Sequence, residues 1–193
     1  AAPAYQKLAD RHYGISDDNP EDFSRLLEEV YGESRQRCRG VVHLWSLDPA
    51  LTREAYNGSQ QPTSCRSTLY LVQAMARARW PEPPRLWLVT RAAQHAGPAL
   101  HALNVEQAPL WGLGRVIALE HPELHCVRLD LDHRQDADEA LFIVEELLSP
   151  DQEQEIAYRG GERYVPRLSP HERTAADPVQ VRLTEYGQID NLT

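Results

Sequence analysis

Short apolar runs rich in β-forming residues alternate along this chain with stretches of helical periodicity. The strand-like runs are residues 38–47 (CRGVVHLWSL), 85–90 (RLWLVT) and 124–132 (LHCVRLDLD). The helical stretches between and after them cover residues 64–79, 105–119 and 136–148. Strands that alternate with helices are typical of a parallel sheet covered by helices on both faces. The sequence therefore predicts an α/β fold of the Rossmann-like type.

Local signals fix several element ends. Asn19 before Pro20 predicts a helix start, and the helical spacing that follows ends at Gly32. Asp136 with Glu139 resembles a capping box for the helix that runs through Leu148. The sequences EIAYR and ERYVPRL flank a Gly-Gly pair at 160–161, which predicts a two-residue β-hairpin.

The chain divides into three parts. Residues 1–168 are predicted to form the α/β domain with its C-terminal hairpin. Residues 169–178 (SPHERTAADP) are polar with prolines at both ends and are predicted as a linker. Residues 179–193 resume a strand-like pattern. The chain starts without a methionine, and we expect it to be a piece of a larger polypeptide.

Composition excludes several classes of partner. The 193 residues carry 20 Lys and Arg against 29 Asp and Glu, a net charge of −9, which disfavours nucleic acid and anionic membranes. No run approaches the roughly 20 apolar residues of a membrane span, and the N-terminus does not resemble a secretion signal. Three widely spaced cysteines fit reduced thiols. We expect a cytoplasmic protein.

A Gly-x-Gly at Gly112 and Gly114 precedes a helical run and raises the question of a dinucleotide loop. Such a loop needs a preceding strand and a third glycine, where Ile117 stands here. The glycines also lie inside the helical pattern itself. We therefore interpret them as permitting close packing of this helix against a neighbour.

Three segments resemble proteins of the short-chain dehydrogenase/reductase family. GLGRVIALE followed by CVRLDLD is similar to a helix and strand of that family. GVVHLWSLD and LWLVTRAAQ are similar to two strand ends of polyketide ketoreductases. These three segments occur in the same order and at similar separations as in that family. They therefore define an alignment register from which the family's catalytic positions can be located in this chain.

Ketoreduction in that family uses a Tyr as acid, a Ser that holds the carbonyl oxygen and a Lys that lowers the pKa of the Tyr. The register places Leu103 at the Tyr position and Gln107 four residues later. The Ser position falls near Thr90 or Arg91, and the Lys position near Ser64. Where the family has small residues lining the cofactor cleft, this chain has Leu44, Trp45 and Ser46, and the indole of Trp45 is expected to fill that space.

Taken together, residues 5–168 resemble the structural, non-catalytic subdomain of a ketoreductase from a modular type I polyketide synthase. The motifs that carry the resemblance are LADRHYGISDDNPEDF, CRGVVHLWSLD, LYLVQAM, PRLWLVTRAAQ, QAPLWGLGRVIALEHPEL and YRGGERYVPRL. The resemblance implies a truncated Rossmann fold that packs on a separate catalytic subdomain. That partner would carry the NADPH site, and no catalytic, cofactor or metal-binding residue is expected in this chain.

The resemblance also implies a strand and helix upstream of Ala1, and we expect this N-terminal strand and helix to be missing from the domain. The tail VRLTEYGQIDNLT resembles the first strand of an enoylreductase domain. The further partners implied are that enoylreductase and the acyl carrier protein of the same synthase. Two alternatives remain open: a pseudo-ketoreductase beside another catalytic domain such as a methyltransferase, and an active NADPH-dependent reductase.

Several other polar residues are candidates for a metal-binding or acid-base site. His121, His125 and Cys126 lack a Cys-x-x-Cys partner, so we expect no metal there. His43 is interpreted as a satisfied core histidine. Asp130 and Asp132 are expected to form a solvated pair, and Glu145 and Glu146 to lie on a solvated helix face. Trp45, Trp87 and Trp111 are expected to be core or interface aromatics.

Overall fold

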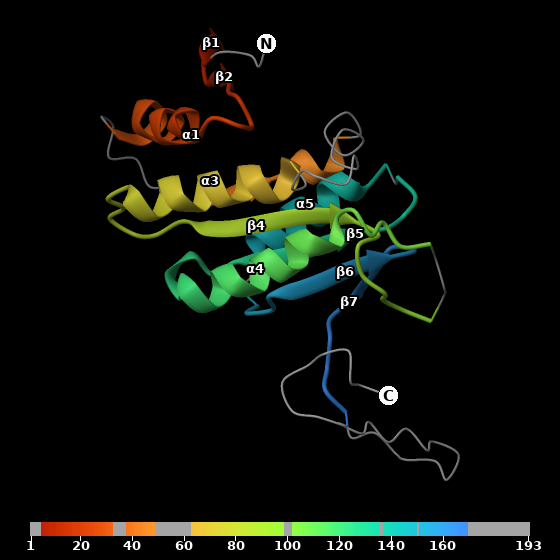
Figure 1. Cartoon of the computed structure of the whole chain (residues 1–193). Coiled ribbons are helices and arrows are strands. Elements are labelled where there is room, and N and C mark those ends of the chain that lie inside the picture. Colours follow the sequence, from red (N-terminus) through yellow and green to blue (C-terminus); the bar gives the residue numbers. More distant parts are fainter. Residues whose placement is uncertain are drawn as a thin grey trace, which may run out of the picture.

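A five-stranded sheet in the order β3-β4-β5-β6-β7 forms the centre of the molecule (Figure 1). The structure is a computed structural model that describes residues 5–32, 38–48, 63–98, 102–135, 137–149 and 151–169. The strands are β3 (Gly40–His43), β4 (Arg85–Arg91), β5 (Val127–Leu131), β6 (Glu155–Arg159) and β7 (Glu162–Tyr164). Strands β3 to β6 pair in parallel, and β7 returns antiparallel to β6. The predicted α/β architecture is confirmed.

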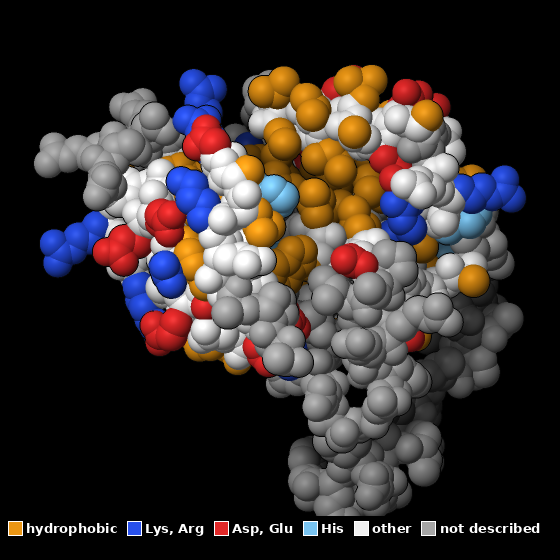
Figure 2. Space-filling view, turned by 90° about the horizontal axis from the view of Figure 1, so that it is seen from above, with side chains coloured by type: hydrophobic (Ala, Val, Ile, Leu, Met, Phe, Trp, Pro, Cys, Tyr) orange, Lys and Arg blue, Asp and Glu red, His pale blue; other side chains and the backbone are white. Residues whose placement is uncertain are grey.

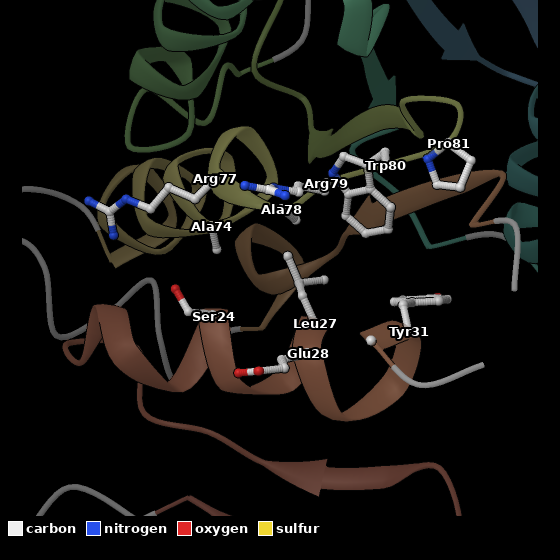
Figure 3. Close-up of a pocket in the computed structure, with 11 residues that line it drawn as sticks. Ser24, Leu27, Glu28, Tyr31, Ala74, Arg77, Ala78, Arg79, Trp80 and Pro81 are labelled. Atoms are coloured by element: carbon white, nitrogen blue, oxygen red, sulfur yellow. The ribbon is translucent and has the colours of Figure 1, made fainter. Parts of the chain in front are cut away.

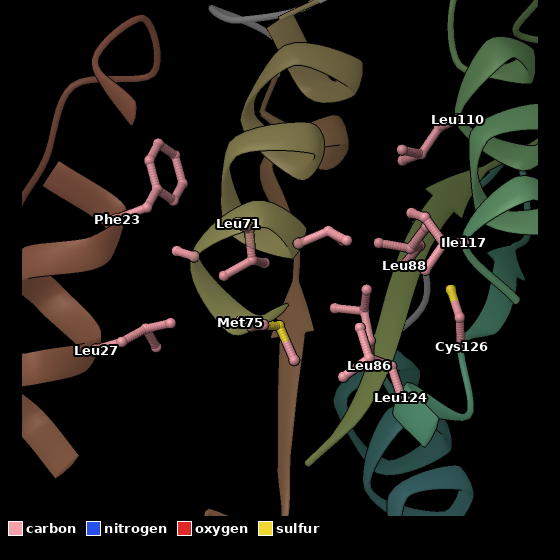
Figure 4. Packing of buried hydrophobic residues seen from close by; sticks show 12 residues of the cluster. Phe23, Leu27, Leu71, Met75, Leu86, Leu88, Leu110, Ile117, Leu124 and Cys126 are labelled. Carbon is pink, nitrogen blue, oxygen red and sulfur yellow. The ribbon is translucent and has the colours of Figure 1, made fainter. Parts of the chain in front are cut away.

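Helices cover both faces of the sheet, so β4 is buried on both sides. Leu86 and Leu88 pack in one core cluster with α3 (Thr63–Arg77) and α4 (Ala108–Glu120) (Figure 4). Trp87 and Val89, which point to the opposite face, pack in a second cluster with α5 (Glu139–Leu148). The β5-α5-β6 crossover therefore has the opposite hand to the two crossovers before it, although the strands step in one direction.

Residues 5–32 lie on the side of α3 that faces away from the sheet (Figure 1). Helix α1 (Pro20–Leu27) continues into a π-helical turn, η1 (Glu28–Gly32), and its Phe23 and Leu27 extend the first core cluster (Figure 4). The Asn19 side chain accepts a hydrogen bond from the Glu21 backbone N–H at 3.2 Å, which confirms the predicted cap. A hairpin of β1 (Gln6–Ala9) and β2 (His12–Gly14) precedes the helix. Its strands are short and mostly exposed, so no apolar pattern indicated them.

Two predicted strands are shorter in the structure. The run 38–47 is a strand only at β3, and its last residues form a 3₁₀ turn, η2 (Trp45–Leu47). Within this turn, the fully buried Ser46 hydroxyl donates to the Val89 carbonyl of β4. In the run 124–132, a 3₁₀ turn η4 (Pro122–Leu124) and His125 with a φ of 40° precede β5.

Two predictions about helix ends and hairpins have different outcomes. Helix α5 begins at Glu139 with Asp138 as its N-cap, so Glu139 is the first helical residue and not the third, and the predicted capping box is wrong. Asp136 lies outside the described residues.

The Gly160 and Gly161 pair has φ values of 58° and 81°, as a type I′ turn requires, and joins β6 to β7 as predicted. The predicted linker beyond Ser169 and the strand-like tail lie outside the described residues.

The two glycines of the Gly-x-Gly have different surroundings within α4. A Cβ on Gly114 would lie 2.7 Å from Cδ of Arg128, a residue of β5, and 3.1 Å from a Leu88 methyl carbon. Close packing of helix on sheet therefore explains Gly114, as predicted. A Cβ on Gly112 would meet no described atom within 4 Å, so the packing interpretation is wrong for Gly112.

Candidate functional site

The carboxyl edge of the sheet is where open α/β folds bind ligands, and here it holds a buried polar network. Thr90, at the end of β4, donates through its hydroxyl to Asp130 Oδ1 at 2.5 Å. The same hydroxyl oxygen accepts from the Trp111 indole N–H at 2.8 Å. Thr90 and Asp130 are both fully buried. The hydroxyl at the end of β4 is therefore engaged by a strand and a helix of the same chain.

Asp130 is the centre of this network. Its carboxylate accepts from the backbone N–H groups of Ala93 and Gln94 at 2.9 and 3.1 Å, and it forms an ion pair with Arg159 at 2.5 Å. Arg159, itself buried, also donates to backbone carbonyls of β5, of Tyr158 and of Gln94. The prediction of a solvated acid pair is therefore wrong for Asp130.

Asp132 has a separate role just beyond β5. It is partly exposed and accepts from the Gly160 N–H at 2.6 Å and from the ring of His133. Burial alone would raise the pKa of Asp132, but the hydrogen bonds from Gly160 and His133 outweigh it and lower the pKa. Asp132 thus fixes the β6-β7 turn.

The positions that the family register assigns to catalysis have other uses here. Leu103 is 44% exposed and carries no titratable group. Gln107 is buried, and its side-chain oxygen accepts from the Arg91 backbone N–H at 2.8 Å. Arg91 forms an ion pair with Glu139, and Ser64 is buried in α3. Thr90, Arg91 and Gln107 lie together at the carboxyl edge, and Ser64 lies in the first turn of α3.

The residues after β3 occupy the neighbouring part of this edge. Trp45 packs edge-on against Phe23, with ring centroids 5.7 Å apart and an interplanar angle of 63°, and it lies 5.8 Å from the His43 ring. Ser46 is fully buried against β4. Trp45 and Ser46 are therefore engaged in contacts within this chain.

His43 is a buried core histidine, as predicted, but only half of its ring is satisfied. Nε2 lies 2.9 Å from the Ser67 hydroxyl of α3. Among the described residues, Nδ1 has no hydrogen-bond partner. Burial lowers the pKa of His43 from 6.5 to about 4, so the ring is neutral near pH 7.

The remaining candidate residues from the sequence include His121 and Cys126, as candidate metal ligands, and the tryptophans, as core or interface aromatics. His121 contacts Glu123 at 3.1 Å, and burial raises the pKa of the Cys126 thiol to about 11. Within the described ranges, no three His, Cys, Asp or Glu side chains are grouped as a metal site. Trp87 and Trp111 are buried, and Trp45 packs on the core, so these aromatics serve as predicted.

Glu145 is exposed as predicted, but the solvated-face prediction is wrong for Glu146. Glu146 is buried and accepts from the Tyr158 hydroxyl at 2.7 Å and from Arg163 of β7. Burial, together with the hydrogen bond to Glu146, raises the pKa of Tyr158. This cluster ties α5 to the hairpin.

A groove of about 420 Å³ runs between α3 and α4 on the side away from the sheet. Its walls are mainly apolar, and Leu69 and Val116 in them are 40% and 45% exposed. The lining residues are Leu69, Val72, Gln73, Ala76, Arg77, Leu113, Val116, Ile117, Glu120 and His121. Hydrophobic side chains also gather in a hollow on the face seen in Figure 2, with charged side chains mostly around it. In the described part of the chain, no helix combines the length and apolar character needed to cross a bilayer.

A comparison with protein families matches residues 5–168 to the model described as "Polyketide synthase extender module SpnB, Rossmann fold domain". The chain belongs to this family. Its fold is correspondingly similar to solved ketoreductases of modular polyketide synthases. An A1-type ketoreductase aligns with a TM-score of 0.65 and 28% identity over 86% of this chain, and an A-type ketoreductase with 0.64 and 29% over 79%.

Curated relatives match over about half of this polyketide synthase domain. A phenolphthiocerol/phthiocerol polyketide synthase of Mycobacterium tuberculosis is 42% identical over 87 residues, 45% of this chain. A mycocerosic acid synthase-like polyketide synthase of Mycolicibacterium smegmatis is 42% identical over 96 residues, 50% of this chain. The matches span 6% and 4% of those relatives, and 33% and 32% of the two ketoreductase chains.

Proposed function

We propose that this chain is the structural, non-catalytic half of a polyketide synthase ketoreductase. It binds no cofactor and supports a separate half that carries the NADPH site. The observation that carries the proposal is the network at the carboxyl edge, where the buried Asp130 is bonded to the buried side chains of Thr90 and Arg159. A reductase needs its hydroxyl groups at this edge exposed to a substrate.

The partial coverage of the solved ketoreductases supports the same proposal. This chain aligns with about a third of each solved ketoreductase, 33% and 32%. The remaining two thirds of those ketoreductase chains have no counterpart in the aligned region. The further partners are the enoylreductase and the acyl carrier protein of the same cytoplasmic synthase.

The groove between α3 and α4 is the proposed docking surface for the catalytic half. It exposes apolar side chains from two neighbouring helices, and burying apolar surface is the main source of association free energy. Helices α3 and α4 pack on the sheet in one core cluster, in which Met75 of α3 and Ile117 of α4 join Leu88 of β4.

A titration with NADPH tests the absence of a cofactor site. We expect neither enhanced nicotinamide fluorescence nor a rise in melting temperature when NADPH is added to the chain. Saturable binding accompanied by thermal stabilisation would favour an active reductase instead.

Co-expression with the catalytic ketoreductase half of the same synthase tests docking. Val116→Lys places a charge in the groove and should abolish co-purification and lower ketoreductase turnover. Leu119→Lys is the matched control, because Leu119 lies on the same helix, is 82% exposed and does not line the groove. Equal behaviour of the two variants would exclude this surface.

A further inference from the structure

A second pocket lies far along α3 from the carboxyl edge, between α1 with η1 and the end of α3 (Figure 3). Its volume is about 410 Å³, within the range of small-ligand and peptide-anchor pockets. The lining residues are Ser24, Leu27, Glu28, Tyr31, Gly32, Ala74, Arg77, Ala78, Arg79, Trp80 and Pro81. It shares only Arg77 with the groove between α3 and α4.

Two aromatic rings form a preorganised wall of this pocket. Tyr31 and Trp80 meet edge to face, with centroids 5.7 Å apart and an interplanar angle of 65°. The Trp80 indole N–H donates to the Met75 carbonyl at 2.8 Å, and the Tyr31 hydroxyl interacts with Cys38. Because their polar atoms are engaged, the rings are held in place and present apolar surface to the pocket.

The charges around the pocket are unbalanced. Arg77 and Arg79 are exposed, and neither forms an ion pair with a described residue, while Glu28 is the single acid in the lining. This local positive excess lies on a chain whose net charge is −9. An aromatic wall beside guanidinium groups that have no ion-pair partner among the described residues matches a ligand that combines an apolar side chain with carboxylates.

We propose that this pocket binds an acidic peptide segment of a partner protein. One aromatic or aliphatic side chain of the segment packs against the rings of Tyr31 and Trp80. The same side chain also contacts the apolar lining residues Leu27 and Ala74. Neighbouring carboxylates pair with the guanidinium groups of Arg77 and Arg79. The contact is separate from docking of the catalytic half and does not depend on it.

The test uses the 193-residue chain labelled with 5-fluorotryptophan, with the Trp80 ¹⁹F resonance assigned from Trp80→Phe. The probes are the capped peptides Ac-Asp-Phe-Glu-NH₂ and Ac-Lys-Phe-Lys-NH₂. We expect the acidic peptide to shift the Trp80 resonance saturably and the basic peptide to leave it unchanged. No saturable shift, or an equal response to both peptides, would overturn the proposal.

Two variants and a control locate the binding. Arg79→Glu should weaken the acidic peptide about tenfold, since it replaces an attractive charge by a repulsive one. Ser24→Phe should occlude the pocket and remove the saturable shift. Arg134→Glu, at an exposed arginine that does not line the pocket, should bind as the unmodified chain does. Equal weakening by Arg79→Glu and Arg134→Glu would reduce the effect to net charge and overturn the pocket assignment.

Discussion

Asp130 and Arg159 form an ion pair of 2.5 Å in which the aspartate side chain is fully buried and the arginine nearly so. The pair joins the middle of the sheet to its last parallel strand. Loss of one partner from a buried pair leaves an uncompensated charge, at a cost of about 3–5 kcal/mol. Asp130→Asn should therefore lower the free energy of unfolding by roughly that amount, as measured by urea denaturation.

A surface ion pair provides the control for Asp130. Glu153 pairs with Arg167 at 2.6 Å, and the arginine side chain is 64% exposed. Glu153→Gln should therefore lower the free energy of unfolding far less than Asp130→Asn does, because solvent screens an exposed pair. Similar losses in both variants would mean that the buried network contributes no more than a surface pair.

The two glycines of α4 should respond in opposite directions to the same substitution. Gly114→Ala forces a Cβ against Arg128 and Leu88 and should destabilise the protein by about 1–3 kcal/mol. Gly112→Ala meets open space and should stabilise it by about 0.5–1 kcal/mol, because alanine loses less conformational entropy in a helix. Thermal unfolding of the two variants measures whether each melting temperature rises or falls relative to the unmodified chain. A higher melting temperature for Gly114→Ala would contradict the packing explanation.

The fold could be predicted from local patterns, whereas the polar sites could not. Residues 85–90 are apolar because β4 is covered on both faces, and that pattern is visible in the sequence. The burial of Glu146 depends on Tyr158 and Arg163, which reach it from the later hairpin. Asp130 likewise has its charge partner, Arg159, on the adjacent strand β6. A pattern of polarity along one element does not contain such partners.

The position that the register assigns to the catalytic Tyr offers a test of the non-catalytic proposal. Leu103→Tyr should give no NADPH-dependent reduction of a β-ketoacyl thioester, because the Thr90 hydroxyl is buried and bonded to Asp130. Consumption of NADPH with and without the thioester measures this. Turnover above the unmodified chain would show that a hydroxyl at this edge does reach a substrate.

His43 should make the stability of the fold depend on pH. Burial lowers its pKa from 6.5 to about 4, so the folded state disfavours the protonated ring. The stabilisation is present above pH 6.5 and is lost as the pH falls toward 4, by at most about 3 kcal/mol. Because carboxylates titrate in the same window, urea denaturation at pH 7 and pH 4.5 must be compared between the unmodified chain and His43→Gln. The variant should lose less stability between the two pH values. An imidazole that titrates above pH 6 by NMR would contradict the buried, neutral state of this ring.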